Sequence, residues 1–294
     1  NLYFLGRHAE AAGCLRQALD RYPVAGRRET ATMVGVDMRP GTMSYRAANL
    51  WVRGFPDRAL RAVREALDDA LRTEIPVSRC VALHLAGGTV STWAGDLDTA
   101  EAALAQSLAL AERHSLGPYV GYELCAQGAL RTARGDPALG ADLLREGLRR
   151  MRESTYYLFY AQFLADYALA AGRVGRIDES RTAIDEAVER IEKTEGFCVY
   201  PEALRIKAEV LLMADDVDLS AAEALLLRSL EEARAREALS WELRGATSLA
   251  QLRRRQGRFA EAHALLAAVH DRFSEGFATA DLVNARGLLA TTAA

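Results

Sequence analysis

The sequence predicts an all-α protein, a right-handed α-α superhelix of about seven stacked helix pairs closed by a C-terminal capping helix. Two observations predict it: a short motif recurs about every 40 residues, and each proline falls between expected helices or in a first helical turn. A β-rich fold would need alternating apolar strands at short spacing, and the sequence has none. We therefore expect residues 1–294 to form one helical-repeat domain.

Each repeat is marked by a glycine at the turn between its two helices. The turn glycines are Gly6, Gly54, Gly95, Gly135, Gly175 and Gly257. Their spacings are 48, 41, 40, 40 and 82 residues, and the last spacing covers two repeats. Glycine supplies the left-handed conformation that ends the preceding helix.

Small residues accompany each glycine at fixed positions. One follows five residues later and another seven residues after that, except that Val269 takes the second position after Gly257. Seven residues are two helical turns, so both positions lie on one face. Small side chains there let neighbouring helices approach closely. This pattern is typical of tetratricopeptide (TPR) helix pairs, with helices longer than in the common form of roughly 34 residues.

Two segments depart from the regular repeat. We expect residues 24–43 to be an irregular insertion, because Pro40 and Gly41 would break a helix and the first spacing is long. We expect residues 278–292 to form the capping helix. The chain starts inside a repeat, which predicts a fragment of a larger multidomain protein, and Asn1–Phe4 fits either a native helix end or a tag remnant.

Composition argues against several classes of partner. The net charge of −3 provides no basic field for nucleic acid or anionic lipid. The four cysteines form no C-x-x-C pair, and no run of 18 apolar residues occurs. We expect a cytoplasmic protein with no disulfide framework, no membrane contact and no direct contact with nucleic acid.

Catalytic and cofactor motifs are absent from the sequence. It contains no Walker A loop, no H-E-x-x-H and no G-x-S-x-G. The carboxylates lie beside arginines at helical surface spacing, which is typical of solvated ion pairs. We therefore predict no enzyme activity, no catalytic residue, no cofactor and no metal site.

The concave groove is the remaining candidate site. In such solenoids the first helix of each pair lines the concave surface, where ligands bind. Counting back from the turn glycines places these residues there: Trp51, Thr89, Thr92, Trp93, Tyr122, Arg173, Arg244, Thr247 and Gln251. Tryptophan, tyrosine and arginine are favoured at interfaces. The alternative is that Trp51 and Trp93 only fill space between repeats.

Three segments carry a resemblance to a known family. They are the heptapeptide GFPDRAL from Gly54 to Leu60, LRIKAEVLL from Leu204 to Leu212, and SWELRGATSLA from Ser240 to Ala250, which continues through Gln256-Gly257-Arg258. The chain resembles the C-terminal TPR region of large bacterial ATPase-type (STAND-like) transcriptional regulators and related adenylate-cyclase-like signalling proteins. The resemblance covers nearly the whole chain, but is loose in the first 45 residues.

The resemblance implies a regulatory interaction module of a bacterial transcriptional or signalling regulator. Such a module would bind a partner protein or its own upstream domains, since the nucleotide and DNA sites of that family lie in other domains. The alternative function is a small-molecule effector sensor that uses the concave groove. A closed superhelix with a polar, aromatic-lined pocket would favour the sensor, whereas a wide, flat groove would count against it.

Overall fold

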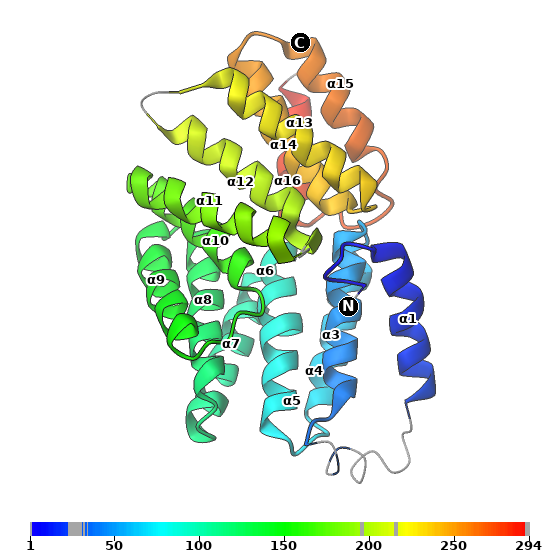
Figure 1. Cartoon of the computed structure of the whole chain (residues 1–294). Coiled ribbons are helices and arrows are strands. Elements are labelled where there is room, and N and C mark those ends of the chain that lie inside the picture. The colour runs from blue at the N-terminus through cyan, green and yellow to red at the C-terminus, as the bar shows by residue number, and fades with distance from the viewer. Residues whose placement is uncertain are drawn as a thin grey trace.

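The computed structural model describes residues 2–22, 31, 33, 35–194, 197–214 and 217–291, and every regular element in these ranges is a helix (Figure 1). The N-terminal part holds α1 (His8–Arg21), α3 (Met38–Val52), α4 (Pro56–Ala70), α5 (Pro76–Val81), η1 (Ala82–Val90), α6 (Ser91–Ala94), α7 (Leu97–Arg113), α8 (Gly117–Ala133) and α9 (Pro137–Glu153). The C-terminal part holds α10 (Tyr160–Arg173), α11 (Ile177–Thr194), η2 (Phe197–Val199), α12 (Tyr200–Met213), α13 (Leu219–Ala235), α14 (Leu239–Arg255), α15 (Phe259–His270) and α16 (Ala280–Ala290). The predicted all-α class is confirmed.

Consecutive helices pack as antiparallel pairs, as the repeat predicts. The pairs are α3–α4, α5/η1/α6 with α7, α8–α9, α10–α11, α12–α13 and α14–α15. Helix α1 takes the place of a second helix, because residues 2–6 form the same glycine turn in front of it. At Gly54, φ is +85° and the N–H donates to the carbonyl of Trp51, which ends α3 as expected.

Close helix contact explains the small residues. A Cβ added at Gly128 in α8 would lie 2.7 Å from the backbone oxygen of Gly140 in α9. Gly87 and Gly88 lie against α7, where an added Cβ would come within 2.4 Å of Ala103 and Leu104 respectively. Their backbone forms a π-helix, η1, which the sequence pattern does not predict.

The expected irregular insertion over 24–43 is wrong at its C-terminal end. Helix α3 begins at Met38, so Pro40 and Gly41 lie in its first turns, where a missing N–H breaks no helical hydrogen bond. Asp37 caps this helix by accepting a hydrogen bond from the backbone N–H of Arg39. Residues 24–30, 32 and 34 of the predicted insertion lie outside the described ranges.

The superhelix turns back on itself, so that its C-terminal helices stack on the ends of its N-terminal helices (Figure 1). Ser240 at the start of α14 donates a hydrogen bond to the carbonyl oxygen of Trp51 at the end of α3, at 2.5 Å. The N–H of Cys198 likewise donates to the carbonyl of Phe4, at 3.1 Å. These contacts join segments far apart in the sequence and close the ring of inner helices.

Helix α16 lies over the last pair. Its buried residues Leu282, Ala285 and Leu288 join one apolar core with Leu249 and Leu266 of α14 and α15. The segment is shorter than the expected 278–292, and its last described residue is 291. Among the described helices, none is long and apolar enough to cross a membrane.

Candidate functional site

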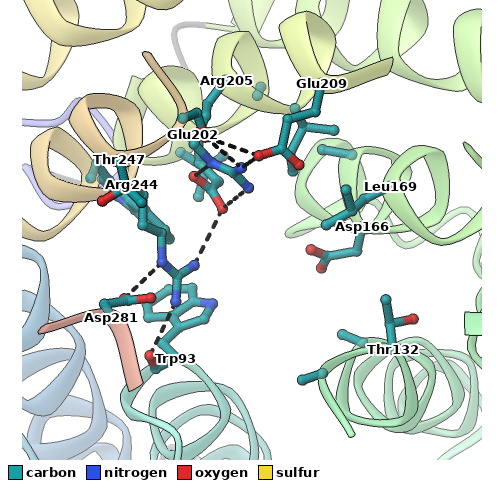
Figure 2. Close-up of a pocket in the computed structure, with 18 of the residues that line it drawn as sticks. Trp93, Thr132, Asp166, Leu169, Glu202, Arg205, Glu209, Arg244, Thr247 and Asp281 are labelled. Atoms are coloured by element: carbon teal, nitrogen blue, oxygen red, sulfur yellow. Dashed lines mark hydrogen bonds and ion pairs between the residues drawn. The ribbon is translucent and has the colours of Figure 1, made fainter. Parts of the chain in front are cut away.

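A cavity of about 510 Å³ lies between the inner helices of the two ends. Its walls come from η1, α6 and α8 on one side and from α10, α12, α14 and α16 on the other (Figure 2). Most of the predicted groove residues line it: Thr89, Thr92, Trp93, Arg173, Arg244, Thr247 and Gln251. The helical register therefore places these side chains around one shared, half-open cavity.

Trp51 lies behind this cavity and is 2% exposed. Its ring centroid is 5.0 Å from that of Trp93 and 4.7 Å from that of Trp241, while the rings of Trp93 and Trp241 are 5.2 Å apart. These are all three tryptophans of the chain. Trp51 thus fills space between repeats, as the alternative prediction stated, whereas Trp93 packs against it and also lines the cavity.

The structure places Tyr122 in the core, away from the cavity. It is 3% exposed, its ring packs against His84 and Phe163, and its hydroxyl donates to the carbonyl of Leu158. Burial raises the pKa of this phenol far above its usual range. The cavity meets α8 from Ala126 onward, and Tyr122, one turn earlier, is held in the core by its ring contacts and its bond to Leu158.

Arg244 is held at the centre of an ion-pair network. Its Nε donates to Asp281 at 2.8 Å, Nη1 to Glu202 at 3.2 Å, and Nη2 to the carbonyl of Trp93 at 3.1 Å. Its guanidinium carbon also lies 4.9 Å from the ring centroid of Trp51 and 5.2 Å from that of Trp241. One side chain thereby connects α6, α12, α14 and α16.

Arg205 continues the network along α12. Its Nε and Nη2 donate to the two carboxylate oxygens of Glu202 at 2.7 and 2.8 Å, and Nη1 donates to Glu209. Ser248 donates to Glu209 at 2.9 Å. Burial alone would raise the pKa of Glu202, but Arg205 and Arg244 outweigh burial and hold that pKa below its ordinary value.

Asp166 stands apart from this network. Its carboxylate extends from α10 into the cavity, across from Glu202 and Arg205 (Figure 2). In the part of the chain that the structure describes, its carboxylate makes no hydrogen bond and no ion pair. Burial, and to a lesser degree the charge of Glu202, raise its pKa to about 7, although Arg244 and Arg205 act in the opposite direction.

The acidic residues of this site are not among the predicted groove residues, although helical spacing could have found several of them. Asp166 precedes Arg173 by seven residues, which is two helical turns on one face. Glu202, Arg205 and Glu209 follow the same rule on α12. Carboxylates beside arginines at this spacing are also typical of solvated surfaces, and the sequence does not show that the superhelix closes. Within the described ranges, no group of three histidine, cysteine or acidic side chains could hold a metal ion.

Comparisons with known proteins identify the fold and nothing finer. No family model and no curated protein sequence matches this chain. A tetratricopeptide repeat protein from Parabacteroides merdae ATCC 43184 has a similar structure, with a TM-score of 0.52 at 11% identity, over 97% of this chain and 98% of that one. Yeast Tom70 gives a TM-score of 0.49 at 16% identity, over 97% of this chain and 58% of its own. The first likeness shows that the chain is a TPR-like solenoid.

Proposed function

We propose that this protein is a non-catalytic sensor module that binds a small organic effector in the cavity between the ends of its superhelix. The observation that carries the proposal is the half-open cavity of about 510 Å³, lined by polar and aromatic side chains from both ends. Sites for small molecules usually measure roughly 300–1,000 Å³ and combine apolar walls with a few convergent polar groups.

Closure of the superhelix favours the effector over a protein partner in the groove. A groove that accepts a helix or an extended peptide must stay open along its length. Here Ser240 bonds to Trp51 and Arg244 to Trp93, so the two ends of the solenoid meet beside the cavity. For the concave face we therefore propose a small-molecule effector, and a partner protein would bind elsewhere on the solenoid.

A regulator context, which the sequence resemblance implies, would give the cavity a role in signalling. A ligand that contacts both α10 and the network of α12, α14 and α16 would stabilise the closed arrangement. The outer helices would then transmit that state to a partner protein or to upstream domains of the same polypeptide. The quoted motifs and the common use of repeat solenoids as binding scaffolds support this part of the proposal.

Thermal unfolding against a panel of small metabolites tests the proposal. A compound at about one hundred times its dissociation constant adds roughly 2.7 kcal/mol of stability and raises the midpoint by several degrees. Ala129→Trp fills the cavity from α8 and should abolish the shift. Ala105→Trp, at an exposed position of α7, is the matched control and should retain it. A shift that survives Ala129→Trp would place the ligand elsewhere and contradict the proposal.

A further inference from the structure

We infer that the ligand of this cavity carries a positively charged organic group, an ammonium or guanidinium, that pairs with the carboxylate of Asp166. The inference rests on the proposed function and specifies the chemistry of the same site. It follows from the balance of charge inside the cavity, from the occupied donors of its two inner arginines, and from the aromatic wall beside them.

The inner wall of the cavity carries more negative than positive charge. Two guanidinium groups, of Arg205 and Arg244, meet three carboxylates, those of Glu202, Glu209 and Asp281. Asp166 adds a further carboxylate opposite them. Negative charge in a partly desolvated site is unfavourable unless a cation compensates it.

Two further arginines line the cavity but do not compensate this charge. Arg173 and Arg255 lie at the C-terminal ends of α10 and α14, and both are exposed to solvent. At a helix C-terminus a cation interacts favourably with the helix dipole, and solvent screens its effect on distant groups. These side chains therefore leave the inner wall with its excess of negative charge.

An anionic ligand would find no free cation on the inner wall. Each nitrogen of Arg244 donates to a protein acceptor, Asp281, Glu202 or the carbonyl of Trp93. Arg205 is likewise engaged by Glu202 and Glu209. A phosphate or carboxylate would have to displace one of these partners and would then face the remaining carboxylates. The donors of Arg205 and Arg244 are therefore occupied by acceptors of the protein itself.

The walls suit an organic cation better than a bare metal ion. Trp93, Phe163 and Leu169 give the cavity apolar surface, and aromatic rings such as that of Trp93 attract ammonium groups. A metal ion would need several free oxygen ligands, whereas Glu202, Glu209 and Asp281 are already paired with arginines. Asp166 can supply one carboxylate to an ammonium, with room beyond it for the rest of the molecule.

Calorimetric titration of the full chain with matched compounds tests the inference. The cationic probes are tetramethylammonium, choline, cadaverine and agmatine. The neutral isostere of choline is 3,3-dimethylbutan-1-ol, and its anionic counterpart is 3,3-dimethylbutanoate. At least one cation should bind, and its affinity should exceed that of the neutral or anionic compound by about tenfold or more. Asp166→Asn should remove most of this preference, whereas Asp68→Asn, at an exposed position of α4, should leave it unchanged.

The outcomes separate this inference from the proposed function. If the cavity binds neutral or anionic metabolites whose thermal shift Ala129→Trp abolishes, the sensor function holds and the cationic ligand class is wrong. If a cation binds equally well to the wild type and to Asp166→Asn, Asp166 is not its partner and the inference is overturned. If neither these probes nor the metabolite panel gives a shift that Ala129→Trp abolishes, both proposals fail.

Discussion

The backbone N–H of Gly276 donates a hydrogen bond to Oδ2 of Asp57 at 2.9 Å, across 219 residues of sequence. In the reverse direction, the N–H of Arg58 donates to Glu275 at 2.9 Å, and its guanidinium lies 3.0 Å from the same carboxylate. The loop before α16 is thereby joined to the first turn of α4. These contacts, together with the hydrogen bond from Ser240 to Trp51, hold the superhelix in its closed form.

Removing the carboxylate of Asp57 should loosen this closure. Asp57→Ala takes away the acceptor of the Gly276 N–H and a favourable negative charge at the N-terminus of α4. We expect a loss of about 1–2 kcal/mol in the free energy of unfolding, measured by urea denaturation. Asp68→Ala, at the exposed C-terminal end of the same helix, should cost less than about 0.5 kcal/mol. Equal effects of the two substitutions would show that the closing contact adds no stability.

The close contact between α8 and α9 predicts opposite effects on stability for two glycine-to-alanine substitutions. Gly128→Ala would place a Cβ 2.7 Å from the backbone oxygen of Gly140 and from Leu144, so α8 and α9 would have to separate. We expect a cost of about 1–3 kcal/mol in unfolding free energy. Gly13→Ala meets no atom within 4 Å and should instead stabilise α1 by up to about 1 kcal/mol. Urea denaturation of both variants measures the difference, and a stabilised Gly128→Ala would refute the close approach.

The repeat pattern was sufficient to predict the fold. The turn glycines and small residues report contacts between adjacent helices, and such local contacts recur with the period of the sequence. Helical register also placed Thr89, Trp93, Arg244 and Thr247 on the inner face, where they line the cavity. The π-helix at 82–90 escaped prediction, because it keeps the apolar composition of an ordinary helix and changes only the width of its turns.

Closure could not be predicted, because it depends on how small rotations between repeats add up. The sequence contains no sign that Ser240 would meet Trp51, or that Asp57 would meet Gly276. Without closure, an acidic residue on an inner helix such as Asp166 resembles any solvated carboxylate. Asp166, Glu202 and Arg244 become candidate site residues because they line one cavity, and that cavity arises from contacts that do not repeat.

Arg244 should contribute strongly to stability through its three acceptors. Arg244→Ala leaves Glu202 and Asp281 without this cation and removes the contact with Trp51 and Trp241. Because the pairs are not fully buried, we expect a loss of about 2–4 kcal/mol in unfolding free energy. Arg244→Lys should recover less than half of it, since an ammonium cannot span three acceptors as the guanidinium fork does.

Fluorescence of the three tryptophans measures the loss of stability in the Arg244 variants. All of them lie in the cluster beside Arg244, so their fluorescence during urea denaturation reports on this region. Arg255→Ala, on the exposed end of the same helix, should change the midpoint little. Wild-type stability in Arg244→Lys would mean that charge alone, without the geometry of the guanidinium, holds α14 against α6 and α16.

Asp166 predicts a pH dependence with a defined sign. The groups that act on it electrostatically are Glu202 and Arg205 on α12, Arg244 on α14, and the nearby thiol of Cys125 on α8. Its pKa is raised from 3.8 to about 7 in the folded chain, so between these values the native state binds more protons than the unfolded state. The contribution of this group therefore makes the ligand-free protein less stable as pH rises from about 4 to about 7. Urea denaturation across that range should show Asp166→Asn gaining stability relative to the wild type, with a constant difference above pH 7.

A bound organic cation should reverse the trend, because it favours the ionised carboxylate. Affinity for choline or the best-binding cation should then rise by about tenfold from pH 6 to pH 8, as the proton ceases to compete for Asp166. In Asp166→Asn the affinity should be low and nearly independent of pH over this interval. Calorimetric titrations at three pH values measure both effects. A wild-type affinity that does not change with pH would mean that the cation binds without ionising Asp166, and would contradict the pairing on which the ligand assignment depends.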